Sequence, residues 1–154
     1  MRKFIVVSAL ILMMSAFIFG FGIELGGGVN DFFVPTVAAG INVPIAGNFS
    51  LTGQFSALFA LVSNIPMVFM PLGGGRYTVD MKNMKLFIGA DGGVKLGGGS
   101  PMFPVFGFNG GVLFQTLYIK GAMRWVSMSV NTGESLENEL VPLFELTAGI
   151  NWAF

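Results

Sequence analysis

The sequence contains no cysteine and no histidine among its 154 residues. Without cysteine the chain has no disulfide framework, no thiolate metal site and no attachment point for a lipoprotein anchor. Without histidine it lacks the commonest metal ligand and the usual general base of Ser-His and Cys-His pairs. We therefore predict no catalytic residue, no metal site and no cofactor, and a function that is not enzymatic.

Charged residues are also scarce. They make up 10% of the sequence, with eight basic and eight acidic side chains, whereas 53% of the residues are hydrophobic. Glycine (23 residues) and phenylalanine (17 residues) are abundant instead. This balance is typical neither of a soluble globular domain nor of a disordered chain. It also provides no basic footprint for a nucleic-acid partner.

The first 22 residues have the layout of a secretory signal peptide. Arg2 and Lys3 precede an apolar run over residues 4–19, and Gly20-Phe21-Gly22 ends the run with small residues at alternate positions. The alternative is a single membrane-anchoring helix, since the run is almost long enough to span a bilayer. We expect a signal peptide over residues 1–22 and one domain over residues 23–154, because the segments that follow are strand-like.

Beyond residue 22, apolar and polar residues alternate with period two in segments separated by turn signals, which is the pattern of a transmembrane β-barrel. The turns after the second, fourth and sixth segments are short, and those after the third, fifth and seventh are longer, as in a barrel whose N-terminus lies in the periplasm. We predict an all-β, antiparallel up-and-down transmembrane barrel of about eight strands. The expected strands cover residues 23–29, 34–43, 49–61, 76–81, 85–96, 105–114, 117–130 and 140–154.

The terminal segment, residues 140–154, places apolar and aromatic side chains on one face of an extended strand and small, polar ones on the other. Thr147, Gly149, Trp152 and Phe154 resemble, position for position, the C-terminal targeting signal of bacterial outer-membrane β-barrels. The resemblance to the small outer-membrane β-barrel proteins implies a location in the cell outer membrane, reached through the periplasm. It also implies the surrounding lipid and the barrel-assembly machinery as partners.

In such a barrel the polar faces must look inward, because hydrocarbon solvates neither charges nor free backbone groups. The interior of an eight-stranded barrel is only just wide enough for side chains to fill it. We predict an internal ion-pair and hydrogen-bond network formed by Glu24, Gln54, Asp91, Asn109, Lys120, Arg124 and Glu145. We interpret this network as a structural plug, and the alternative is a conducting gate.

Two predicted loops are candidates for contact with a surface partner. Residues 62–75 contain two prolines and three consecutive glycines but are unusually apolar. They either form a loop over the barrel mouth or in part lengthen the neighbouring strands. Residues 131–139 form an acidic loop, which we expect to be solvated.

No activity motif accompanies these features, and function has to be argued from a site rather than from a fold. The first expectation is a small barrel with a structural or surface-interaction role and a plugged interior. A narrow pore or a small-amphiphile carrier is the second. The third is a soluble periplasmic lipocalin-like barrel with its apolar faces turned inward, which the scarcity of charge on the polar faces disfavours.

Overall fold

A computed structural model describes residues 20–31, 34–59, 67–97, 102–131 and 136–154, and it describes the backbone alone for residues 127–131 and 136–138. Residues 1–19, which make up most of the predicted signal peptide, lie outside the described residues. Within the described part of the chain, no helix is long and apolar enough to cross a membrane.

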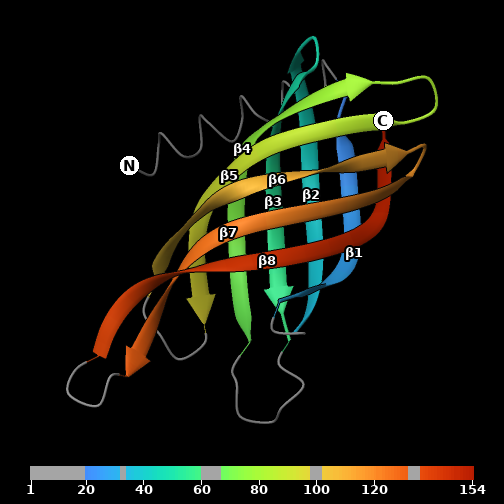
Figure 1. The fold of residues 1–154 in the computed structure, drawn as a ribbon. Coiled ribbons are helices and arrows are strands. Elements are labelled where there is room, and N and C mark those ends of the chain that lie inside the picture. Colours follow the sequence, from blue (N-terminus) through green and yellow to red (C-terminus); the bar gives the residue numbers. More distant parts are fainter. Residues whose placement is uncertain (1–19, 32–33, 60–66, 98–101, 132–135) are drawn as a thin grey trace.

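In the described part of the chain, eight antiparallel strands form one closed barrel, in which each strand pairs with its neighbours in the sequence (Figure 1). The first and last strands close the seam by pairing from Gly22↔Ala153 to Asn30↔Glu145. The predicted fold class and topology are therefore confirmed. The strands are β1 (Gly22–Asn30), β2 (Pro35–Ala46), β3 (Phe49–Leu58), β4 (Val68–Asp80), β5 (Lys85–Gly97), β6 (Phe103–Phe114), β7 (Leu117–Asn131) and β8 (Leu136–Ala153).

The two ends of the barrel differ. The connections after β2, β4 and β6 are short, as predicted, and they lie with Gly22 and Ala153 at what we call the turn end. Gly47 and Gln115 each have a φ of 52°, the left-handed conformation that tight hairpin turns require. At the opposite, loop end, β7 and β8 project past their neighbours (Figure 1), because their pairing continues to Asn131↔Leu136.

The segment predicted as loop 62–75 is largely strand. β4 begins at Val68, so the prediction was wrong for residues 68–75, and the alternative that they lengthen a strand is correct. Proline has no N–H to donate to a neighbouring strand. Pro71 is accommodated in β4 because the pairing of β4 with β5 is interrupted at this position. Pairing with β3 continues through Phe55↔Pro71. Residues 62–66 lie outside the described residues.

The predicted acidic loop 131–139 is also shorter than expected. β7 extends to Asn131 and β8 begins at Leu136, because the ribbon between these two strands remains paired up to its tip. Residues 132–135 lie outside the described residues. Two of the three acidic residues expected in this loop, at positions 137 and 139, therefore belong to the strand β8.

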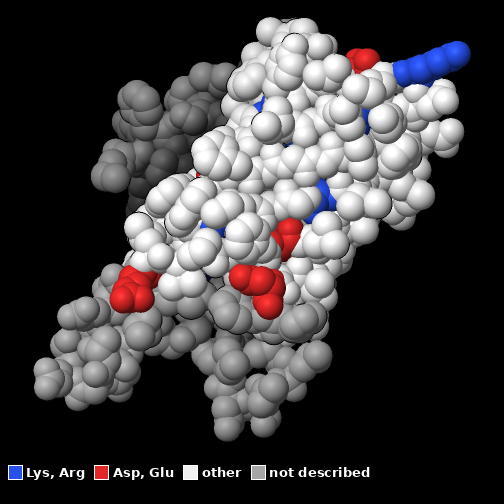
Figure 2. All heavy atoms as spheres, in the orientation of Figure 1, with Lys and Arg blue, Asp and Glu red and all other residues white. Residues whose placement is uncertain are grey.

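The outer wall of the barrel is apolar. Figure 2 shows one face on which charged atoms gather toward the ends and show elsewhere only in small patches between uncharged side chains. Every strand contributes large hydrophobic side chains to this surface at alternate positions, as the sequence predicted. The soluble lipocalin-like alternative, which requires a polar exterior, is therefore wrong. Exposed residues include Leu25, Ile41, Leu51, Phe55, Tyr77, Ile88, Phe106, Phe108, Ile119, Phe144, Leu146 and Ile150.

The glycines of the wall fall into two groups. A Cβ atom added to the inward-facing Gly107 would lie 2.3 Å from the carbonyl oxygen of Met123, so the crowded lumen requires glycine there. A Cβ added to the outward-facing Gly121 would have the carbonyl oxygen of Gly110 as its nearest neighbour, at 4.0 Å. The barrel's own packing therefore demands the first group and leaves the second unexplained.

Spin labels test which face of the wall meets hydrocarbon. Because the chain has no cysteine, the variants Phe55→Cys, Ile88→Cys and Gln54→Cys would each carry a single label. In lipid vesicles we expect the labels at positions 55 and 88 to collide with oxygen dissolved in the hydrocarbon, and the label at position 54 to be shielded, as measured by power-saturation EPR. Water exposure at positions 55 and 88 would contradict the assigned orientation.

The two glycine groups predict opposite mutational effects. Gly107→Ala should lower the free energy of unfolding by about 1–3 kcal/mol or prevent assembly, because the methyl group overlaps the backbone of β7. Gly121→Ala should leave stability unchanged or raise it by about 0.5 kcal/mol, because alanine suits a strand interior better than glycine. Urea unfolding in lipid vesicles measures both, and equal effects would refute the distinction.

Candidate functional site

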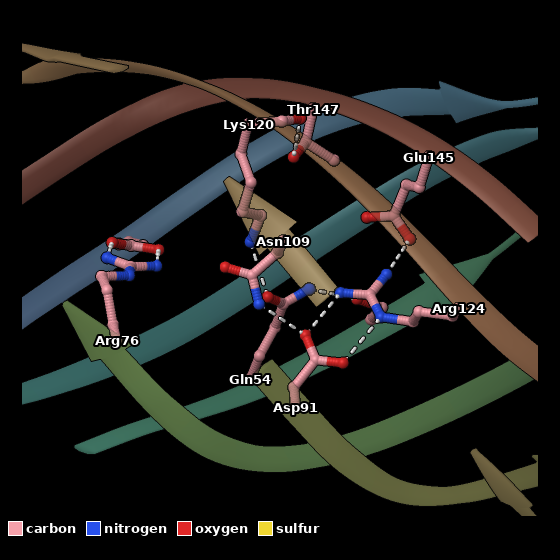
Figure 3. A network of polar contacts seen from close by, with 10 residues as sticks. Gln54, Arg76, Asp91, Asn109, Lys120, Arg124, Glu145 and Thr147 are labelled. Carbon is pink, nitrogen blue, oxygen red and sulfur yellow. Dashed lines mark hydrogen bonds and ion pairs between the residues drawn. The ribbon is translucent and has the colours of Figure 1, made fainter. Parts of the chain in front are cut away.

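The candidate site is the lumen of the barrel, where polar side chains from most of the strands converge. Six of the seven residues predicted for an interior network point into the lumen in Figure 3, and the seventh, Glu24, is buried there against Arg76. They are divided among three clusters of contacts, together with residues that the sequence analysis did not include. An apolar layer lies beyond them toward the loop end.

The largest cluster surrounds Arg124 of β7, whose side chain has a relative exposure of 0%. Its Nη1 donates to Oε2 of Glu145 at 2.6 Å, and its Nη2 donates to Oδ2 of Asp91 at 3.2 Å. Nε of Arg124 also donates to Oδ1 of Asp91 at 3.3 Å. Asn109 on β6 donates its Nδ2 to the same carboxylate at 2.9 Å. One guanidinium thus joins two buried carboxylates from β5 and β8 and gives each of them a cationic partner, although Oε1 of Glu145 has no hydrogen-bond partner within the described part of the chain.

A second cluster lies nearer the turn end and joins Glu24 of β1 to Arg76 of β4. Both nitrogens of the guanidinium fork donate to the carboxylate, Nη1 to Oε1 and Nη2 to Oε2 at 3.1 Å. Asn151 on β8 donates to Oε1 of Glu24 at 3.2 Å. The guanidinium carbon of Arg76 also lies 4.3 Å from the centre of the Phe87 ring, within the range of a cation–π contact.

The sequence analysis missed Arg76 and Asn151 as members of the network. Arg76 alternates with the outward-facing Tyr77, so its inward direction was readable from the sequence. Its partner was not, because Glu24 is 52 positions away and the two meet only through the register of the closed barrel.

The third cluster is centred on Lys120 of β7. Its Nζ donates to Oε1 of Gln54 on β3 at 2.5 Å, and Nε2 of Gln54 donates to Oγ of Ser56 at 2.6 Å. Thr147 on β8 donates its hydroxyl to the backbone carbonyl of Lys120 at 3.3 Å. This lysine therefore reaches a neutral amide, and the carboxylates of the other two clusters are engaged by arginines.

Four buried basic residues face three buried acidic ones among the described residues. The basic residues are Arg76, Lys95, Lys120 and Arg124, and the acidic ones are Glu24, Asp91 and Glu145, so the formal balance is four minus three, or +1. The sequence analysis expected three acids and two bases. Arg76 and Lys95 make the difference, and both alternate with outward-facing apolar neighbours. Within the described part of the chain, no three acidic side chains are grouped to hold a metal ion.

The loop half of the lumen contains an apolar cluster, which the sequence analysis did not predict, and the buried Lys95 also lies in this half. Met70, Leu72, Val105, Val126 and Leu143 form a buried cluster, against which Leu58 and Val68 pack. Met70 and Leu72 belong to the segment that was predicted as a loop, so their inward direction was not recognised. Toward the turn end, in contrast, a cavity of about 330 Å³ reaches the Glu24–Arg76 pair.

The four residues predicted as the assembly signal lie on both faces of β8. Thr147 is buried, and a Cβ added to Gly149 would lie 2.1 Å from the carbonyl oxygen of Leu25 across the seam. Trp152 and Phe154 face outward and are exposed. The inward pair thus fits the closure of the barrel, and the outward pair stays accessible at the turn end.

No protein-family model matches the sequence, and no curated protein matches it either. Solved structures do resemble the chain. Neisserial surface protein A (NspA) aligns over 88% of this chain and 95% of its own, with 14% identity and a TM-score of 0.58. The N-terminal β-barrel domain of Pseudomonas aeruginosa OprF aligns over 87% and 98%, with 10% identity and a TM-score of 0.58. The outer-membrane enzyme PagL aligns over 84% and 97%, with 12% identity and a TM-score of 0.50.

These similarities show the fold. The chain has the fold of the small eight-stranded outer-membrane β-barrels, as its sequence predicted. The fold and the apolar wall are those of a protein located in the outer membrane. PagL shows that an enzyme shares this fold with surface proteins, so the fold alone assigns no activity.

Replacing Arg124 tests how strongly the largest cluster holds the lumen together. Arg124→Met should lower the free energy of unfolding by about 3–5 kcal/mol, because it leaves two buried carboxylates without a cation. The matched control is Lys85→Met, which removes an exposed partner of Asp80 and should cost less than about 1 kcal/mol. Urea unfolding in lipid vesicles measures both. An Arg124→Met barrel as stable as the parent would show that the pairing contributes nothing to stability.

Proposed function

We propose that this chain is a sealed, non-enzymatic barrel with a structural or surface-interaction role in the outer membrane. The observation that carries the proposal is the occupancy of the lumen by two successive layers of side chains. Polar clusters connect β1, β3, β4, β5, β6, β7 and β8 across the interior. The apolar cluster of Met70 and its neighbours lies beyond them in the loop half, where Lys95 is also buried.

The apolar layer distinguishes a plug from a gate. An ion that entered from the turn end would have to leave water and pass between buried methyl and methylene groups, at a high desolvation cost. Rearranging the ion pairs would not remove this barrier, because Val105, Val126 and Leu143 make no polar contact that a rearrangement could break. The interior therefore supports a permanent closure.

Absence of histidine and cysteine from the sequence supports a non-enzymatic role, because the usual bases and thiol nucleophiles are missing. Interaction with a surface partner would fall to the loop end, where β7 and β8 project beyond the wall. In this proposal the terminal strand, with Thr147, Gly149, Trp152 and Phe154, is the segment that the barrel-assembly machinery reads.

A specific observation favours the amphiphile carrier as the second candidate. The cavity at the turn end is lined by Phe87, Leu113 and Tyr118 as well as by Glu24 and Arg76, so it offers apolar and charged groups together. It ends at the polar clusters, so a molecule bound there would enter and leave through the same end.

Single-channel recording in planar bilayers tests the sealed barrel. We expect no large, stable conductance from folded protein, whose folding is verified by heat-modifiable mobility on a gel. A general porin in the same bilayer serves as the positive control. Reproducible open steps that require folded protein would overturn the plug and favour the narrow pore.

A further inference from the structure

We propose that a depression in the outer wall is a binding site for a single membrane lipid whose headgroup carries an ammonium group. The depression has a volume of about 620 Å³ and crosses the wall from β5 over β6, β7 and β8 to the end of β1. The proposal is independent of whether the lumen conducts.

The floor of the depression consists of two glycines that face each other across β6 and β7. Gly110 and Gly121 are register partners, and the next residues in the same row are Ile88 on β5 and Leu146 on β8. Both glycines face outward, because they alternate with the inward-facing Asn109 and Lys120. Side chains of the neighbouring row, those of Phe108, Met123 and Phe144, form the wall toward the loop end.

The barrel itself gives no reason for glycine at position 121. A Cβ added to Gly121 would meet nothing closer than 4.0 Å, whereas one added to Gly110 would crowd the Phe87 carbonyl oxygen at 3.3 Å. Glycine weakens a strand interior, and it often marks a bulge, a bend or the close approach of a ligand or another backbone. In this wall, such a molecule would contact the exposed side chains of Ile88, Phe108 and Leu146.

One end of the depression is polar. The backbone N–H of Asp31 donates to the carbonyl oxygen of Phe144 at 2.9 Å, which holds this residue beside the apolar wall. Asp31 is exposed and lines the depression together with Asn30. A carboxylate next to an apolar trough is complementary to an amphiphile with a cationic head and a hydrocarbon tail.

A second copy of the chain is a poorer occupant than a lipid. A symmetric dimer brings the same patch of both subunits together. Burial of this patch against a second copy would desolvate both Asp31 carboxylates, and no basic residue of the described chain lines the depression to pair with them. A lipid places its acyl chain in the depression, and its ammonium head would neutralise the carboxylate.

Quenching of tryptophan fluorescence by brominated lipid tests the site. The sequence has two tryptophans, and Trp125 packs edge-on against Phe108 of the wall at 6.1 Å between ring centres. In a Trp152→Phe background, Trp125 is the sole reporter. The protein is placed in vesicles of unlabelled phosphatidylglycerol containing a small fraction of either brominated phosphatidylethanolamine or brominated phosphatidylglycerol. We expect the ethanolamine lipid to associate about two- to fivefold more strongly, as an ion pair at a partly exposed carboxylate allows.

Three variants separate the parts of the site. Gly121→Leu fills the depression and should abolish the excess quenching. Gly73→Leu, the matched control, adds the same bulk to an outward position on β4 where a Cβ meets nothing closer than 4.0 Å, and it should retain the excess. Asp31→Asn should remove the preference for the ammonium headgroup and keep quenching by both lipids.

Several outcomes would overturn the proposal. These are equal quenching of the parent by the two headgroups, full retention of the excess in Gly121→Leu, or its loss in Gly73→Leu. Resistance of Trp125 to quenching by any lipid would show that a protein surface covers the depression. Heat-modifiable mobility verifies that every variant compared is folded.

Discussion

An unpaired backbone N–H or C=O in hydrocarbon has no water to bind, and this constraint decides the architecture of the chain. A sheet satisfies it only by closing, so the pairing of β1 with β8 is the interaction on which the rest depends. Phe21, which belongs to the predicted signal peptide, also contacts Phe154: the amide of Phe154 donates to its carbonyl at 2.9 Å, and the two rings stack at 5.2 Å. Within the predicted domain, the seam runs from Ile23↔Trp152 to Asn30↔Glu145.

Closure of eight strands leaves a lumen so narrow that its contents are dictated by space and charge together. Glycines such as Gly107 are required where a neighbouring strand leaves no room for a Cβ. Arg124, the register partner of Gly107, fills the space that remains, and Asp91 and Glu145 match its charge. Neighbouring strands thus place a glycine beside a long charged residue in the lumen.

Much of this was readable from the sequence, because period-two alternation fixes the face of each residue before any pairing is known. The strand count, the apolar exterior and the inward direction of Arg124 and Asp91 all rest on that period. The alternation does not determine which residues of two strands lie opposite each other, so the Glu24–Arg76 pair could not be derived from the sequence. Pro71 and the glycines that follow it were interpreted as turn signals, but they lie inside β4. The sheet accommodates this proline because Pro71 has no paired residue on β5, and the sequence pattern of one strand does not reveal this interruption.

The order of the layers within the lumen has a physical explanation in access to water. Glu24 and Arg76 line the cavity at the turn end, where water can reach the clusters and lower the cost of burying charge. Arg124 lies deeper, and there each of its two carboxylate partners is engaged directly. Beyond it Met70 and Val126, each with an exposure of 1%, belong to an apolar cluster, although the buried Lys95 lies toward the same end. The ion pairs therefore lie between the water-accessible turn end and this cluster.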